Sequence, residues 1–253
     1  MTLIIQFLLA FQFLTIFPIR ISGKIQDKDL PASMAFYPLV GGVIGALSAG
    51  VFLAASRLFS AEVGVVSAVV ALIVFSGALH LDGFADMCDG FYGHRDPEKV
   101  LAIMKDSRSG AMAIIGVFCL LALKIALLGS FDIPWVFRAL VLAPALGRWS
   151  MVWLSATSMY ARPDGGTASA YIGHVNPPTL LTATISCAGA AFLLLRIRGL
   201  VVMAAVWIFA WAFRRYTQSR IGGATGDTLG ACSELVEVFA LMILSVHGSG
   251  FWS

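Results

Sequence analysis

The chain has 253 residues, of which 59% are hydrophobic and 12% are charged, and its mean hydropathy is +0.88. This composition argues against a soluble globular domain and for an integral membrane protein. The net charge of +3 excludes no class of partner, so the useful information lies in where the charges fall along the chain.

Apolar runs close to the roughly 20 residues that cross a bilayer recur along the whole chain. We expect about seven or eight membrane segments, at roughly 1–19, 34–56, 63–80, 110–130, 135–159, 178–195, 199–213 and 235–250. The first run contains Gln6 and Gln12, which also suits a segment lying at the membrane interface. The prediction is a single all-α membrane domain over residues 1–253, built as a polytopic helix bundle, with motif loops at about 81–109 and 214–234.

The first motif loop carries three carboxylates within eight residues, Asp82, Asp86 and Asp89. In a helix this spacing places them on one face, where like charges repel each other. A divalent cation such as Mg²⁺, which prefers oxygen ligands, would relieve the repulsion; the alternative is a helix end solvated at the membrane edge. Gly83 and Gly90 would permit the close approach of a bulky ligand or of another helix.

The rest of this loop contains a second helix signal, because Asp96 can cap a helix that Pro97 begins. The apolar residues that follow predict a short amphipathic helix along the membrane surface. This helix would bring Asp106 toward the three aspartates as a further ligand. Cations flanking the aspartates would clamp a phosphate or anchor the loop to anionic lipid, and these are Arg95, Lys105 and Arg108.

Three cations fall inside predicted spans, Lys124, Arg138 and Arg148. A charge there is costly and usually faces a partner or a cavity, and Arg148 is the most interesting of the three. His80 directly precedes the aspartates, where a supporting polar contact is favoured over metal ligation. The four cysteines show no spacing typical of a disulfide framework or a zinc site.

The second motif loop contains a glycine-rich stretch, GGATGDTLGA at residues 222–231, just before the last apolar run. Backbone N–H groups at such a helix start suit phosphate oxygens, although a plain turn between spans also explains the glycines. Asp227 favours the interpretation as a phosphate site over a plain turn, because Glu234 lies seven residues later and can share the helical face of Asp227. Together they suggest the second half of a metal–phosphate site.

Cations are unevenly distributed between the loops. With eight crossings, the segments near 20–33, 81–109, 160–177 and 214–234 share one side and carry eleven of the seventeen Lys and Arg residues, against three in the opposite loops. The positive-inside rule therefore predicts that both motif loops face the cytoplasm.

Four motifs together resemble the cobalamin synthase family, the adenosylcobinamide-GDP ribazoletransferases. They are HLDGFADMCDG at 80–90, IMKDSRSG at 103–110, FYPLVG at 36–41 and TGDTLG at 225–230. The resemblance implies that a phospho-cobinamide group is transferred from adenosylcobinamide-GDP to α-ribazole, or to its 5′-phosphate, with release of GMP. It also implies Mg²⁺ as the cofactor, in agreement with the metal expected from the carboxylates.

Site residues are expected on the positions that carry these motifs and charges. The expected catalytic residues are Asp82, Asp86, Asp89, Asp106 and Asp227, the first four of them also as metal ligands. The expected substrate-binding residues are His80, Arg95, Lys105, Arg108, Arg148, Thr225 and Gly226. Besides the two substrates, the expected partner is the lipid bilayer of a bacterial plasma (inner) membrane, with no nucleic acid; the oligomeric state is left open.

Two other functions compete with this one. The stretch from Asp86 to Gly90 matches the opening of the motif of CDP-alcohol phosphotransferases, but Gly93 and His94 replace the Ala and Arg of that family. A cation-coupled transporter would also use acids within the membrane, but it predicts acids near span centres. The acids of this chain instead gather at span ends, beside cations and glycines.

Overall fold

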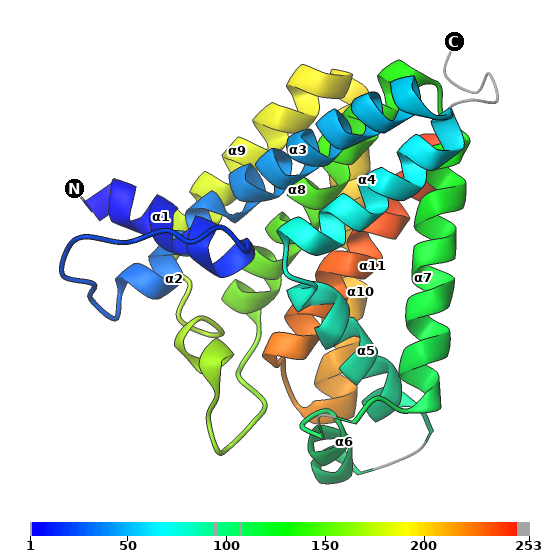
Figure 1. Ribbon diagram of the computed structural model, residues 1–253. Coiled ribbons are helices and arrows are strands. Elements are labelled where there is room, and N and C mark those ends of the chain that lie inside the picture. Colours follow the sequence, from blue (N-terminus) through cyan, green and yellow to red (C-terminus); the bar gives the residue numbers. More distant parts are fainter. Residues whose placement is uncertain (1, 94–95, 107, 247–253) are drawn as a thin grey trace.

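The computed structural model describes residues 2–93, 96–106 and 108–246, and this part of the chain folds into helices joined by turns and loops, without a strand. Its α-helices are α1 (Thr2–Leu14), α2 (Asp29–Ser33), α3 (Tyr37–Leu58), α4 (Ala61–Phe75), α5 (Leu79–Phe91), α6 (Pro97–Ile103), α7 (Ala111–Gly129), α8 (Ile133–Thr157), α9 (Pro177–Leu195), α10 (Ile197–Ile221) and α11 (Gly226–Ser245). Two short 3₁₀ helices, η1 (Met34–Phe36) and η2 (Thr167–Ala170), complete the fold, which Figure 1 shows.

Among the described residues, six stretches are long and apolar enough to cross a membrane: Asp29–Leu58 and the helices α7, α8, α9, α10 and α11. Helices α4 and α5 pass the same test only as a pair, and they are bent by 89° at the break between them. The predicted polytopic helical membrane protein is therefore confirmed, with six or seven helical stretches of the length and composition of a membrane span in the described residues. The break has a local cause, because Gly77 and Ala78 both have positive φ, which ends α4 and redirects the chain into α5.

Several predicted boundaries differ from the structure. Helix α1 has 13 residues, about 20 Å of helix, which is too short for the roughly 30 Å hydrocarbon core. The predicted first segment therefore does not cross as a helix. The last helix begins at Gly226, nine residues before the expected span, because the polar residues at its start still have helical geometry. Hydropathy locates apolar residues, whereas the helix begins at its cap.

Helices α8 and α11 form the interior of the bundle, whereas α7, α9 and α10 keep most of their surface outside. Helix α3 packs closely on α8, since a Cβ atom at Gly41 or Gly45 would collide with the α8 backbone at Pro144 or Leu140. Small residues let helix backbones approach in a bilayer, where no hydrophobic effect drives helices together. The glycines at 41 and 45 are therefore packing residues.

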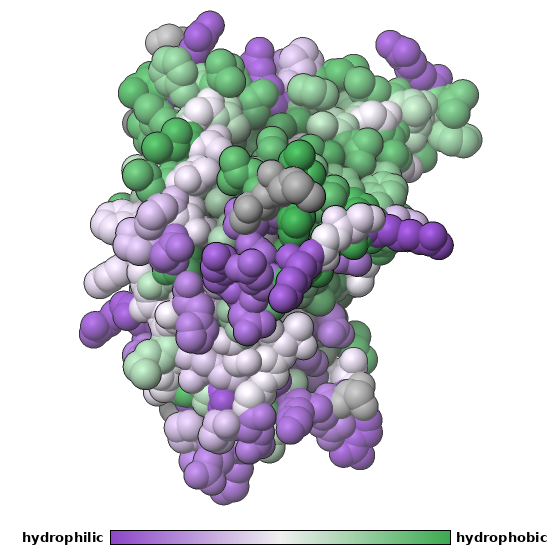
Figure 2. All heavy atoms as spheres, turned by 90° about the vertical axis from the view of Figure 1, so that its left-hand side faces the viewer, coloured by the Kyte–Doolittle hydropathy of each residue, from purple (hydrophilic) through white to green (hydrophobic). Residues whose placement is uncertain are grey.

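The connecting segments with most of the charge meet at one end of the bundle. Arg220 at the end of α10 donates 2.8 Å hydrogen bonds to the carbonyl of Phe91, the last residue of α5, and to that of Gly93 just beyond it. The backbone at Tyr160, after α8, forms an isolated parallel β-bridge with the backbone at Ala224, just before α11. Figure 1 shows this end at the bottom, around α6, and Figure 2 shows hydrophilic residues gathered in the lower half of the molecule, with hydrophobic residues dominating the upper half.

Candidate active-site cleft

Helices α5 and α11 touch through glycines at the polar end of the bundle. A Cβ atom at Gly83 would lie 2.8 Å from the Cα and carbonyl oxygen of Asp227, and one at Gly230 would lie 3.0 Å from the Cα of His80. Gly83 thus permits the close approach of another helix, one of the two uses expected for it, and it also lines a cavity beside this contact. Gly90 has the same use, since its missing side chain leaves room for Met104 just after α6. The contact brings the acidic stretch of α5 against the start of α11.

A cleft of about 250 Å³ opens beside this contact. Its polar wall includes His80 and Asp82 from α5, Asp227 from α11 and Arg162 from the segment after α8. Much of the remaining lining is aromatic and apolar and includes Phe13, Met34, Tyr37, Tyr160 and Tyr171. Sequence positions from near both ends of the chain thus line one cavity that has both charged and aromatic side chains in its walls.

Arg162 is the one cation that lines the cleft among the described residues. Its Nη2 donates a 2.6 Å hydrogen bond to Oδ2 of Asp227, and both side chains are about one-fifth exposed. The sequence prediction missed this residue as a site residue, although it lies in a segment of the positively charged side. Little in the sequence indicates that Arg162 is a site residue, because no local pattern links position 162 to position 227.

The glycine-rich stretch forms the capped start of α11. The Thr225 hydroxyl accepts a hydrogen bond from the Thr228 backbone N–H, and the Thr228 hydroxyl accepts one from the Thr225 N–H. This reciprocal cap satisfies two groups that a helix start leaves unpaired. Gly226 lines the cleft, so the positive end of the α11 dipole lies beside Asp227 at the cavity. Thr225 itself is fully buried beneath it.

The three aspartates of α5 have different surroundings. Asp82 is exposed and lines the cleft, and Asp86 is half-buried one turn further along the helix. Asp89 instead accepts hydrogen bonds from the backbone N–H groups of Gly110 (2.6 Å) and Ala113 (2.9 Å), which caps α7. Within the described ranges, no three His, Cys, Asp or Glu side chains are grouped so that they could hold a metal ion on their own.

The charged residues after α6 lie away from the cleft. Asp106 accepts hydrogen bonds from the side chain and backbone of Arg108, which lower the pKa of Asp106 to about 2. Lys105 lies 4.0 Å from Asp164, and both side chains are mostly exposed. Arg95 lies outside the described residues. Helix α6 does pack near the end of α5, but none of the three described side chains lines the cavity.

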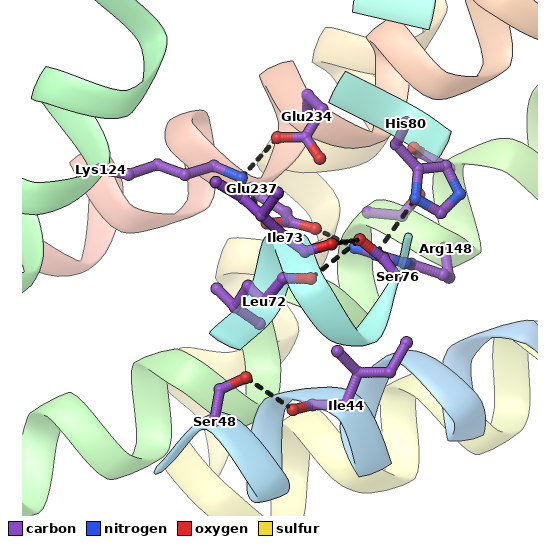
Figure 3. Close-up of polar contacts among 12 residues, drawn as sticks. Ile44, Ser48, Leu72, Ile73, Ser76, His80, Lys124, Arg148, Glu234 and Glu237 are labelled. Carbon is purple, nitrogen blue, oxygen red and sulfur yellow. Dashed lines mark hydrogen bonds and ion pairs between the residues drawn. The ribbon is translucent and has the colours of Figure 1, made fainter. Parts of the chain in front are cut away.

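A second polar cluster, shown in Figure 3, lies inside the bundle and shares His80 with the lining of the cleft. Lys124 of α7 donates to Glu234 (2.5 Å) and Glu237 (2.7 Å) of α11. Arg148 of α8 pairs with the other oxygen of Glu237, and its Nη2 lies 3.2 Å from Nδ1 of His80. We call these five residues the buried network; each is at most 6% exposed.

This network corrects the expected position of Glu234. The carboxylate points into the bundle toward Lys124 instead of joining Asp227 at the polar end. Arg148, expected to bind substrate, lies behind His80 and does not line the cleft. The expected partner of the intramembrane Lys124 and Arg148 is now identified: it is the pair of glutamates. His80 makes the supporting polar contact that its position before the aspartates suggested.

These features define the class of the molecule: a polytopic helical membrane protein with a charged cleft at its polar end and a compensated ionic network behind it. Residues 6–245 match the family model described as cobalamin-5-phosphate synthase. The chain belongs to this family and is therefore a transferase of cobalamin biosynthesis, as its motifs suggested.

Several relatives carry the name adenosylcobinamide-GDP ribazoletransferase. The protein of Clostridium novyi is 33% identical over 244 residues, which cover 96% of this chain and 98% of the relative. That of Desulforamulus reducens is 36% identical over 93% and 94% of the two chains, and that of Geotalea daltonii is 36% identical over 97% and 98%. No solved structure matches the chain.

Proposed function

We propose that this protein transfers the phospho-cobinamide group of adenosylcobinamide-GDP to α-ribazole, or to α-ribazole 5′-phosphate, and releases GMP. The product is adenosylcobalamin or its 5′-phosphate. The relatives' shared name supports the choice of substrates. The observation that carries the proposal is the cleft, where an acidic helix, a helix N-terminus and Arg162 surround one cavity in a way that suits a diphosphate.

The reaction exchanges one phosphate ester bond for another. A ribazole hydroxyl oxygen attacks the phosphorus that carries cobinamide, and the bond from this phosphorus to the bridging oxygen breaks, so that GMP leaves with that oxygen. The hydroxyl proton passes to a carboxylate, for which Asp82 and Asp227 are the cleft-lining candidates. Phosphoryl transfer depends mainly on positioning and on neutralising oxygen charge, and Arg162 supplies a positive charge for that purpose.

Magnesium fits the chemistry of the available donors. Mg²⁺ is commonly held by one or two carboxylates together with substrate phosphates and water, so a ready-made cage of three side chains is not required. We propose that Asp82 and Asp86 hold the ion, with Asp227 nearby on α11. When bound, the metal would neutralise charge on the diphosphate. Asp89 and Asp106 stay predicted ligands, although each already accepts hydrogen bonds elsewhere.

The other predicted residues have supporting parts in this proposal. Lys105 and Arg108, with Arg95, would attract the anionic substrates or contact lipid headgroups at the rim. The excess of cations in the segments at the polar end supports a cytoplasmic orientation of the cleft in a bacterial inner membrane. There the water-soluble nucleotide end of the substrate would enter from the cytoplasm.

The proposal is tested with membranes that contain the protein. They are incubated with adenosylcobinamide-GDP, α-ribazole and Mg²⁺, and GMP and the corrinoid product are measured. We expect both products in equal amounts, their loss on chelation with EDTA, and their return with added Mg²⁺. Absence of product from correctly inserted protein would overturn the proposed reaction, and full activity in EDTA would overturn the metal.

Asparagine substitutions test the site, since they keep the size of each aspartate and remove its charge. We expect Asp82→Asn, Asp86→Asn and Asp227→Asn to lower activity at least about 100-fold. Asp89→Asn and Asp106→Asn complete the set of predicted ligands. The matched control is Asp132→Asn, because Asp132 caps α8 at the other end of the bundle and Asn caps helices equally well. Full activity in all five variants would contradict the proposed site.

A further inference from the structure

His80 belongs both to the cleft and to the buried network. The residue lies in the first turn of α5, lines the cavity beside Asp82, and is only 1% exposed. Its backbone is held by the close packing of Gly230 of α11 against it. His80 therefore links the lining of the cleft to the interior of the bundle.

The contact with Arg148 decides where the imidazole carries its proton. A guanidinium group has N–H donors and no acceptor, so Nδ1 of His80 must accept the hydrogen bond from Arg148 Nη2, 3.2 Å away. An accepting Nδ1 bears no proton, and the ring N–H is therefore on Nε2. Figure 3 shows this second ring nitrogen on the far side of the ring from Arg148.

The Nε2–H group lacks an acceptor. Among the described residues Nε2 has no hydrogen-bond partner, and it is fully buried. A buried donor without a partner costs free energy, so an unsatisfied group of this kind at the wall of a cleft indicates a ligand that supplies the acceptor.

The rest of the network holds the ring in this state. Glu237 binds Arg148 from the other side, and Lys124 joins Glu237 to Glu234. The two cations and two carboxylates balance, so a neutral imidazole leaves the whole cluster uncharged. The cluster is thus compensated within the bundle, where an unpaired charge is costly.

We infer that His80 binds the substrate by donating a hydrogen bond from Nε2 to a phosphate oxygen, and that Arg148 and Glu237 are positioning residues for it. This inference rests on the proposed function and deepens it. Phosphate is the class of acceptor that the surroundings favour, since Arg162 and the N-terminus of α11 line the same cavity. The buried network then has a role in binding besides its role in the packing of the bundle.

Two amide substitutions separate the two nitrogens of the ring. In His80→Gln the side-chain amide reaches the position of Nε2 and keeps a donor there. In His80→Asn the amide reaches only the position of Nδ1, so the contact with Arg148 is kept and the distal donor is lost. We expect His80→Asn to lower kcat/KM for adenosylcobinamide-GDP about 10- to 100-fold relative to His80→Gln.

The matched control is His174→Gln, the same change at an exposed histidine. Its kcat/KM should equal that of the native protein. Activity in His80→Asn that equals or exceeds activity in His80→Gln would overturn the inference, because His80 would then serve only to hold Arg148. Elution of both variants as monodisperse protein in detergent checks that they are folded.

A measurement that does not involve the reaction tests the same inference. In protein labelled with ¹⁵N in the histidine rings, two-dimensional spectra identify which ring nitrogen bears the proton, and His80→Gln identifies the His80 signals. We expect a protonated Nε2 and an unprotonated Nδ1, and we expect the Nε2 signal to shift on addition of inorganic pyrophosphate. A proton on Nδ1, or no shift with saturating pyrophosphate, would overturn the inference even if cobalamin is made. If the shift is seen but no corrinoid product forms, the proposed reaction fails and the donor stands.

Discussion

In the described part of the chain, one cluster of four charged side chains lies inside the bundle, where each charge would be costly alone. Lys124, Arg148, Glu234 and Glu237 come from three helices, and none is more than 6% exposed. Their charges sum to zero, and Glu237 contacts both cations. Such a cluster is weak evidence for stability as a whole, because desolvation offsets the attraction. Breaking it by removing one partner is a different matter, since the others are then left uncompensated.

Replacement of Lys124 by methionine should therefore destabilise the protein strongly. We expect Lys124→Met to lower the free energy of unfolding by about 3–5 kcal/mol, because two buried carboxylates then face one guanidinium. The double variant Lys124→Met/Glu234→Gln should recover at least half of this loss. Thermal unfolding of the purified protein in detergent measures both effects. The control Lys99→Met removes an exposed lysine paired with Asp96 and should leave the unfolding temperature unchanged.

At the scale of helices, the site depends on how closely α5 and α11 approach. Gly83 and Gly230 remove the side chains that would separate the two backbones. The approach sets Asp82 and Asp227 on the walls of one cleft. It also places Nδ1 of His80 within hydrogen-bond distance of Arg148. Glycine is a poor helix former, so its use in both helices has to be explained by this contact.

Alanine at position 83 should separate the helices. Its Cβ would lie 2.8 Å from the backbone of Asp227, which only movement of the helix can relieve. We expect Gly83→Ala to lower the free energy of unfolding by about 1–3 kcal/mol and to reduce activity. The control is Gly189→Ala in α9, where nothing lies within 4 Å of the new Cβ. That change should be neutral or should stabilise the protein by about 0.5–1 kcal/mol; equal behaviour of the two variants would contradict the packing role.

Asp89 has a structural part that can be separated from a role as metal ligand. The two carboxylate oxygens each accept a hydrogen bond from one N–H group at the start of α7, and the single oxygen of an asparagine can keep only one of these bonds. We expect Asp89→Ala to lose about 0.5–2 kcal/mol of unfolding free energy and Asp89→Asn to lose less, because it keeps one of the two bonds. If activity is lost in Asp89→Asn although most of the stability is kept, the negative charge has a chemical role. Equal stability of the two variants would contradict the cap.

The whole molecule has two unlike ends. The segments that follow α5, α8 and α10 meet at the charged end with the cleft, while the turns after α3, α7 and α9 lie at the other end. Each end gathers loops that are far apart in the sequence. The orientation of the protein in the membrane therefore decides from which side of the membrane the substrates reach all the site residues. The cation excess of the cleft end predicts that this side is the cytoplasm.

Single cysteines test the orientation. In a variant whose four native cysteines are replaced by alanine, Asp164→Cys places a thiol in the segment after α8, between the cleft-lining residues Arg162 and Gly166, and Ser130→Cys places one after α7. Both positions are exposed. We expect a membrane-impermeant maleimide to label position 130 in cells with a permeable outer layer, and position 164 only in inverted vesicles. The reverse pattern would contradict the cytoplasmic cleft.

The sequence by itself determined the properties that depend on composition and on local spacing. Hydropathy identified a polytopic helical bundle, and the motifs around Asp82 and Asp227 identified the family. Helical periodicity placed Asp82, Asp86 and Asp89 on one helix. These results are reliable because a span needs about 20 apolar residues wherever it packs, and a motif keeps its local order.

Only the tertiary structure decided the partners of the polar groups. Arg162 meets Asp227 across 65 residues, and Lys124 meets Glu234 across 110, so no local pattern could pair them. Asp89 caps α7 while Asp82 faces the cleft, although both lie on the same helix. The physical reason is that a polar group in a membrane bundle must be satisfied by whichever helix packs beside it, and packing depends on contacts between helices distant in the chain.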